Sequence, residues 1–182
     1  TILRRLNMPG AFVAAAIWAL HPVQVESVAW ITERKNVLSA FFMFASMIVY
    51  LRFAGLDSDD GKPRATFALP AERGKLYFLA LVLFICSILS KSVTGTLPAV
   101  ILLLMWWKRG TIKKEDVLPL VPFFVLAIAM GAVTSYFEKN VVGAQGADWS
   151  FSVSQRFLIA GGAVWFYALK LIFPWKLAFI YP

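Results

Sequence analysis

We predict an all-α chain that forms a multi-pass bundle of transmembrane helices. Of its 182 residues 60% are hydrophobic and only 15% are charged, and the mean hydropathy is +0.72. A soluble domain is usually about half apolar and about a quarter charged, so these residues cannot cover a water-facing surface. Several apolar runs approach the length of about 20 residues that crosses a bilayer. The composition therefore excludes a disordered chain, a nucleic-acid-binding module and an ordinary cytosolic enzyme.

The first two apolar runs are 6–20 and 36–53. The first stops at His21-Pro22, because proline cannot continue a helix. The second is followed by the polar stretch 55–75, whose Asp, Gly and Pro residues are typical of a solvent-exposed loop.

A short polar string, 90–96, separates the third and fourth apolar runs, 76–89 and 97–107. These two runs are about 21 Å and about 16 Å long as helices, so neither crosses the hydrocarbon alone. Either the helices continue through the string, or the string lies below the membrane surface. Non-helical backbone at that depth must be buried in protein or line a wet cavity.

The fifth run, 117–137, is the best single span, and it lies between the polar loops 108–116 and 138–154. The last run, 157–173, could span the membrane or lie at its interface. Together the runs predict about five or six membrane helices with a short interfacial helix.

The distribution of Lys and Arg predicts the orientation, because cytoplasmic loops are enriched in both. With a cytoplasmic N-terminus and five alternating runs, eleven of them lie on the cytoplasmic side and five outside. The eleven are Arg4, Arg5, Arg52, Lys62, Arg64, Arg73, Lys75, Lys108, Arg109, Lys113 and Lys114, and the five are Arg34, Lys35, Lys91, Lys139 and Arg156. Most of the net charge of +8 therefore sets topology. Both polar interruptions, 21–36 and 90–96, fall on the outer face.

The densest polar segment directly follows the first run. Pro22 suits the first turn of a helix, and in a helix that starts there Glu26 and Glu33 lie on one face. The two carboxylates could accept a proton, hold a divalent metal or orient Arg34 and Lys35. Arg34 could also bind a lipid phosphate with two parallel hydrogen bonds. The alternative is an interfacial helix with ordinary polar ends.

Four further side chains are candidates for binding a lipid phosphate. Lys91 lies in the polar string, and an ionisable residue inside a membrane is a functional candidate; the alternative is an ordinary outer turn. Arg156 and Lys170 are fourteen residues apart, so they fall near one helical face together with Tyr167. The alternative for this face is snorkelling side chains.

The string HPVQVESVAWITERKNVLSAFF, residues 21–42, closely resembles a signature of bacterial multi-pass proteins whose membrane part precedes tetratricopeptide repeats. These proteins are similar to the TMTC family of transmembrane and tetratricopeptide repeat proteins, which act as protein O-mannosyltransferases. Residues 90–104 and 165–182 agree with this resemblance.

The resemblance implies that residues 1–182 are part of one GT-C-like transmembrane domain. It implies an enzyme of the bacterial inner membrane that takes a sugar from a polyprenyl-phosphate donor. The acceptor, a protein Ser/Thr side chain or a glycan, would be modified on the periplasmic face. We expect the first outer loop with its acidic residue upstream and the repeats downstream, so the fragment alone would be inactive.

By motif position His21, Glu26, Arg34, Lys35 and Lys91 match the polar signature of this family, and the resemblance implies that they line the donor and acceptor cavity. We hypothesise that Glu26 orients or deprotonates the acceptor, or holds a divalent metal. Arg34, Lys91 and Lys170 would neutralise the leaving lipid phosphate. The string Ser92-Val93-Thr94 departs from the family, in which Pro-Met is common.

Two other classes of protein are also compatible with this sequence. A transporter or flippase-like protein also uses broken helices and polar residues at the membrane midplane. A non-catalytic scaffold would only hold tetratricopeptide repeats at the membrane. In the full-length protein, an acidic residue in the first outer loop favours the enzyme, and inverted repeats favour the transporter. Absence of both features, with the tetratricopeptide repeats retained, favours the scaffold.

Overall fold

The computed structural model describes residues 1–56, 70–141 and 151–174, and in these ranges all regular structure is helical. The described elements are α1 (Ile2–Arg5), α2 (Ala11–Leu20), the 3-10 turn η1 (Pro22–Gln24), α3 (Val25–Ala29), η2 (Ile31–Glu33), α4 (Arg34–Phe53), α5 (Pro70–Ser90), η3 (Ser92–Thr96), α6 (Leu97–Arg109), α7 (Lys114–Val117), η4 (Leu118–Leu120), α8 (Val121–Asn140) and α9 (Val153–Ile172).

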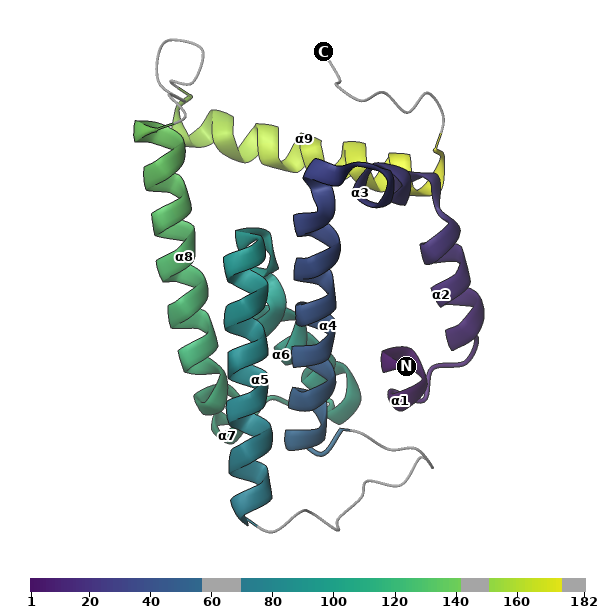
Figure 1. Cartoon of the computed structure of the whole chain (residues 1–182), viewed down its shortest axis with the longest axis vertical. Helices are drawn as coiled ribbons and strands as arrows, with labels where there is room; N and C mark the ends of the chain where they lie inside the picture. Colours follow the sequence, from purple (N-terminus) through teal and green to yellow (C-terminus); the bar gives the residue numbers. More distant parts are fainter. Residues whose placement is uncertain (57–69, 142–150, 175–182) are drawn as a thin grey trace.

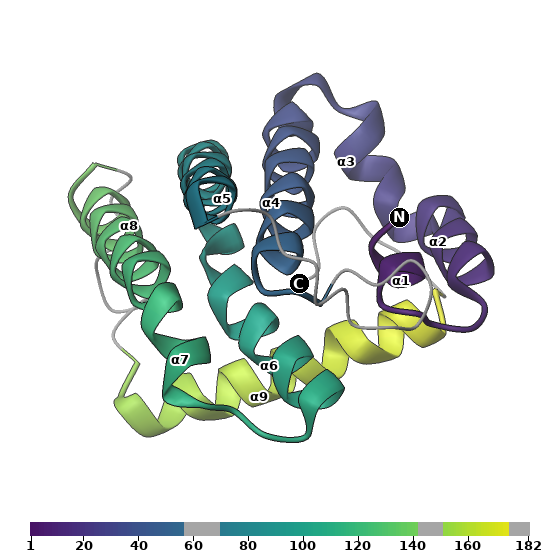
Figure 2. The same cartoon turned by 90° about the horizontal axis from the view of Figure 1, so that it is seen from below.

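Three long helices, α4, α5 and α8, run side by side, and the shorter α6 packs behind them (Figure 1). Helices α4 and α5 form an antiparallel hairpin that supplies the largest helix–helix contact of the described chain. Helix α9 runs roughly at right angles to the long helices, at the level of the upper ends of α4 and α8 in Figure 1. Helix α2 lies to the side of the hairpin, and its Trp18 ring meets the Phe44 ring of α4 edge to face at 6.1 Å. The view from below shows α8, α5 and α4 end on, with α9 passing crosswise to them (Figure 2).

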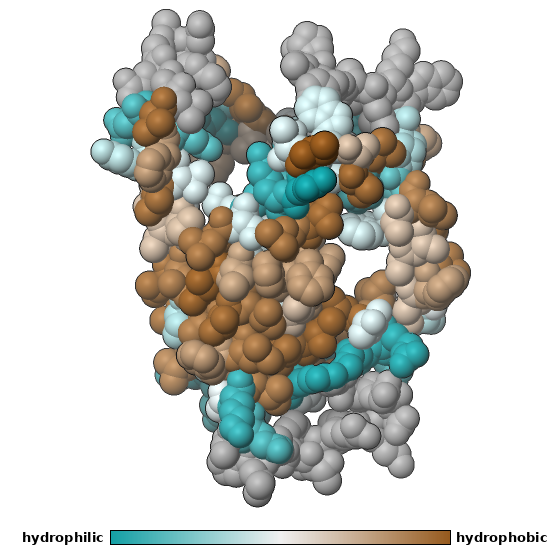
Figure 3. Space-filling model, in the orientation of Figure 1, coloured by the Kyte–Doolittle hydropathy of each residue, from teal (hydrophilic) through white to brown (hydrophobic). Residues whose placement is uncertain are grey.

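Three described helical segments are long and apolar enough to cross a membrane, which indicates a membrane protein. They are Ile31–Phe53, Glu72–Ser90 and Lys114–Asn140. A fourth exists if Ala11–Leu20 and Pro22–Ala29, which meet at 55°, form one broken span. Apolar residues cover the middle of the bundle and hydrophilic residues lie toward both ends (Figure 3). The all-helical membrane fold is confirmed, and the predicted count of five or six spans is not reached in the described residues.

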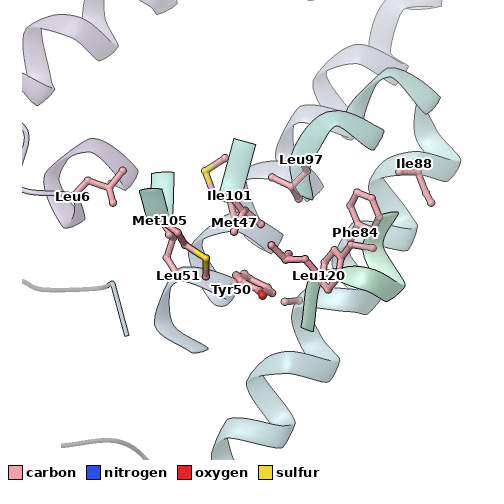
Figure 4. Close-up of a cluster of buried hydrophobic side chains, with 12 residues drawn as sticks. Leu6, Met47, Tyr50, Leu51, Phe84, Ile88, Leu97, Ile101, Met105 and Leu120 are labelled. Carbon is pink, nitrogen blue, oxygen red and sulfur yellow. The ribbon is translucent and has the colours of Figure 1, made fainter. Parts of the chain in front are cut away.

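The apolar core joins the hairpin to α6 and to the start of α8 (Figure 4). Its largest fully buried side chains include Tyr50, Phe84, Ile101 and Phe123. The Tyr50 and Phe123 rings meet edge to face at 5.5 Å, an arrangement that adds to the free energy of burying the rings.

Two buried serine side chains form hydrogen bonds between α4 and α5. Ser46 Oγ donates to Ala80 O at 2.8 Å, and Ser87 Oγ donates to Ser39 O at 2.9 Å. Interhelical hydrogen bonds of this kind hold membrane helices together where lipid removes the hydrophobic driving force. They also fix the register of the two helix ends that carry the polar segments.

The first predicted run is interrupted in the structure. The backbone turns between α1 and α2, where Asn7 and Gly10 have φ of 55° and 72°. As a result α2 has only 10 residues, about 15 Å of helix.

The single helix expected from Pro22 onward is also wrong. The chain instead forms η1, α3 and η2, and Trp30 between α3 and η2 is extended, with φ −88° and ψ 125°. The β-branched residues Val28, Ile31 and Thr32 disfavour a continuous helix here. Glu26 and Glu33 therefore do not share one helical face.

The polar string 90–96 interrupts the helix. This agrees with the second of the two alternatives that the sequence left open, in which the helices do not continue through the string. Helix α5 ends at Ser90, and after Lys91 the 3-10 turn η3 leads into α6. An added Cβ on Gly95 would lie 3.2 Å from the Ala127 Cβ, so η3 packs tightly against α8. Ala127 lies about 20 Å before the end of α8 at Asn140, which places η3 well inside the bundle.

Candidate functional site

The two polar segments of the sequence meet at one end of the α4–α5 hairpin. The Lys91 ammonium, which follows α5, donates a hydrogen bond to Asn36 Oδ1 near the start of α4. The two residues are 55 positions apart in the chain. The structure thus brings the two polar segments into direct contact, whereas the sequence predicted only that they lie on one side of the membrane.

Asn36 is the centre of this polar cluster. Its Nδ2 donates to Glu33 Oε2 at 2.7 Å and to Ser27 Oγ at 3.2 Å. Its Oδ1 accepts from Lys91, so one amide uses both of its donors and an acceptor at once. We call Ser27, Glu33, Lys35, Asn36 and Lys91 the Asn36 cluster.

The backbone at Lys91 is held on both sides. Its N–H donates to Ser87 O at 3.0 Å, which closes the last turn of α5. Its carbonyl accepts from Thr94 N at 3.3 Å and from Thr94 Oγ1 at 2.9 Å. Thr94 is buried, so the turn that carries Lys91 is a fixed part of the core.

Positive charge exceeds negative charge among the described side chains around the Asn36 cluster. The Glu33 carboxylate lies 3.5 Å from Lys35 Nζ and also accepts from Asn36. The Lys91 ammonium is half-buried, and in the described residues its only hydrogen bond goes to a neutral amide. Arg34 is exposed beside Lys35 at the start of α4. This arrangement leaves N–H donors of Lys91 and Arg34 available to an anion.

His21 performs a structural task at the junction of α2 and η1. Its Nδ1 accepts from Val23 N at 3.3 Å, so Nε2 carries the proton and donates to Leu171 O at 2.9 Å. These two bonds tie the junction to the C-terminal end of α9. The His21 ring thus fixes the C-terminal end of α9 to the α2–η1 junction.

The described contacts of the predicted α9 residues Arg156, Tyr167 and Lys170 lie within their own segment. Arg156 Nε donates to Phe151 O at 3.1 Å, and the Lys170 ammonium lies 5.6 Å from the Phe166 ring centroid. Tyr167 is exposed and packs edge to face on Phe166 at 5.4 Å. Since Arg156 and Lys170 are about 21 Å apart along one continuous helix, they cannot hold the same phosphate group.

Glu26 lies in α3, but its side chain is outside the described residues. Among the residues that are described, no group of three or more His, Cys, Asp or Glu could hold a metal ion.

Sequence reasoning missed Asn36 and Ser27 as members of the site. Asn36 stands at the start of an apolar run, where an amide looks like an ordinary helix end. The available signal was its spacing of three from Glu33, which places the two side chains together on a helical turn.

Comparisons with known proteins add nothing to this geometry, because no family model, no curated protein and no solved structure matches the chain.

Proposed function

We propose that this protein is a membrane glycosyltransferase that takes a sugar from a polyprenyl-phosphate donor. The acceptor would be a protein Ser/Thr side chain or a glycan, on the periplasmic face of a bacterial inner membrane. In this proposal the chain is part of a GT-C-like domain similar to that of the protein O-mannosyltransferases named above. The proposed enzyme would work with or without a divalent metal held by Glu26.

The observation that carries the proposal is the Lys91 ammonium paired only with the Asn36 amide among the described residues. An ammonium paired with a carboxylate would have its charge neutralised, whereas an amide orients it and leaves the charge in place. Burial at the end of apolar helices lowers the local dielectric constant, which strengthens its attraction to an anion. A lipid-linked phosphate is the anion that reaches this depth from the bilayer.

Glycosyl transfer from such a donor builds negative charge on the leaving phosphate. Lys91, together with the exposed Arg34 at the start of α4, would stabilise that charge as it develops. Glu26 would orient or deprotonate the acceptor hydroxyl. His21 would act indirectly, by holding α9 in position through Leu171 O.

The test uses the natural full-length protein with a radiolabelled polyprenyl-phosphate sugar and a protein acceptor. We expect Lys91→Gln to lower the transfer rate about 10²-fold, the usual effect of removing one donor to a developing charge. Lys139→Gln, at the exposed end of α8, is the matched control and should keep full activity. Transfer that survives both Lys91→Gln and Glu26→Gln would remove these residues from the mechanism. No transfer by the unaltered protein to any acceptor would contradict the enzyme.

A second function is favoured by the break between α5 and α6. Transporters bind substrates at interrupted helices of this kind, and η3 packs deep against α8 through Gly95. Proteoliposomes that translocate the labelled donor without transferring its sugar would support a flippase. If neither transfer nor translocation occurs, the remaining proposal is a scaffold for tetratricopeptide repeats.

A further inference from the structure

A second polar region lies at the opposite end of the hairpin from the Asn36 cluster. A cavity of 260 Å³ is lined there by residues that include Tyr50, Phe53, Arg73, Arg109, Glu115 and Asp116. A neighbouring cavity of 300 Å³ shares Arg109, Glu115 and Asp116 with it. Tyr50 is about 21 Å from Asn36 along α4, so this region is separate from the candidate site.

The Tyr50 hydroxyl is the first indication of a ligand. Its side chain is fully buried, and in the described structure its oxygen has no hydrogen-bond partner. Nearby Tyr77, in contrast, donates to Pro119 O at 2.9 Å. A buried hydroxyl without a partner is uncommon and costs free energy. Tyr50 is among the residues that line the cavity, and after a small local opening its hydroxyl would reach and donate to a polar group bound there.

The charges around the cavity are of both signs. The Arg109 guanidinium donates to Asp116 Oδ1 and to Ala54 O, and two of its five N–H donors are thereby used. Arg73 lies 5.5 Å from the Phe53 ring centroid. Glu115 is exposed at the rim. The lining therefore offers donors for a phosphate and a carboxylate for a cation within one cavity.

The position of the cavity favours a membrane lipid as the ligand that carries the phosphate and the cation. It lies where α4 ends and α5 begins, and both belong to segments apolar enough to cross a membrane. Phe53 and Met105 give it apolar walls. A phospholipid places its phosphate at this level and its acyl chain along the apolar surface below.

We propose that this cavity binds the phosphoethanolamine headgroup of a membrane phospholipid. The phosphate accepts hydrogen bonds from Arg73, Arg109 and the Tyr50 hydroxyl. The primary ammonium donates to Glu115. Phosphatidylcholine has no N–H to donate, and phosphatidylglycerol has no cation for the carboxylate.

The test measures lipid binding to the whole purified protein in detergent by native mass spectrometry. We expect phosphatidylethanolamine to bind more tightly than phosphatidylcholine or phosphatidylglycerol, and soluble glycerophosphoethanolamine not to compete. Tyr50→Phe should weaken binding about tenfold, the effect of losing one hydrogen bond to a charged group. Its melting temperature without lipid should not fall, because the hydroxyl has no partner to lose. Tyr136→Phe, an exposed tyrosine of α8, is the control and should bind as the unaltered protein does.

Glu115→Gln tests the ammonium contact separately. It should remove the preference for phosphatidylethanolamine over phosphatidylcholine and leave binding of the phosphate in place. Equal binding of all three lipids by the unaltered protein would overturn the proposal, and so would tight binding by Tyr50→Phe. Competition by glycerophosphoethanolamine would assign the site to a soluble ligand and overturn the lipid.

Discussion

At the scale of single residues, one amide connects the two polar segments of the chain. Asn36 accepts from Lys91 and donates to Glu33 and Ser27. No charged residue could do both, because a carboxylate lacks donors and an ammonium lacks acceptors. The identity of this residue thus keeps Lys91 oriented without neutralising it.

Asn36→Leu keeps the approximate side-chain volume and removes all three hydrogen bonds. We expect the free energy of unfolding to fall by about 1–3 kcal/mol, because Lys91 loses its partner in a half-buried position. Thermal unfolding in detergent measures this change.

Asn140→Leu is the matched control for that substitution. Its amide donates only to Tyr136 O at the exposed end of α8, so its effect should stay within about 0.5 kcal/mol. Equal effects of the two substitutions would show that the Asn36 contacts contribute nothing specific.

At the scale of elements, the turn η3 decides where Lys91 lies. Gly95 permits a close approach to Ala127 of α8, and Thr94 is buried beneath it. The turn is therefore wedged between α5 and α8, and the Lys91 backbone cannot move independently of them.

Gly95→Ala should lower the free energy of unfolding by about 1 kcal/mol, since the new Cβ overpacks the contact with α8. Chemical unfolding in mixed micelles provides the measurement. Ala127→Gly alone should cost about 1 kcal/mol through helix propensity. The double variant should lose less than the sum of the two single losses, because it removes the opposing Cβ.

Gly131→Ala, in helix α8, is the control for Gly95→Ala. An added Cβ there meets no described atom within 4 Å, so stability should be unchanged or slightly higher through helix propensity. Strict additivity of the Gly95→Ala and Ala127→Gly losses would mean that the strain lies elsewhere.

At the scale of the whole molecule, α9 lies crosswise to the spanning helices (Figure 1). It has a capping box at Ser152 and Gln155, and it is tied to His21 at its other end. It is not among the described segments apolar enough to cross a membrane. These features favour the interfacial alternative for the last apolar run.

An interfacial α9 predicts that both of its ends are accessible from one side of the membrane. In a Cys86→Ala background, Ser154→Cys and Pro174→Cys should react with an impermeant maleimide added from the same side. Ile112→Cys, in the turn after α6 at the opposite end of the bundle, should react only from the other side. Labelling of Pro174→Cys together with Ile112→Cys would instead make α9 a membrane span.

Local patterns of hydropathy were sufficient to predict much of this protein. They predicted the membrane character and the long helices α4 and α8. They left open whether the helix continues after Ser90, and they made the third run too short to cross the membrane, whereas α5 extends from Pro70 to Ser90 and is long enough. The predicted features depend on residues close together in the chain, where apolar side chains partition into lipid and polar strings do not. The distribution of Lys and Arg predicted that the two polar segments lie on one side of the membrane, but not that they touch.

Only the tertiary structure decided which side chains meet. The bond from Lys91 to Asn36, the crosswise α9 and the unpartnered Tyr50 hydroxyl each depend on segments far apart in the chain. The sequence also did not predict the break at Trp30. The local pattern of residues 21–36 is compatible with one continuous helix and equally with three short helical segments. Hydropathy places each helix in the membrane, but packing between helices sets their register, and register determines which polar atoms find partners.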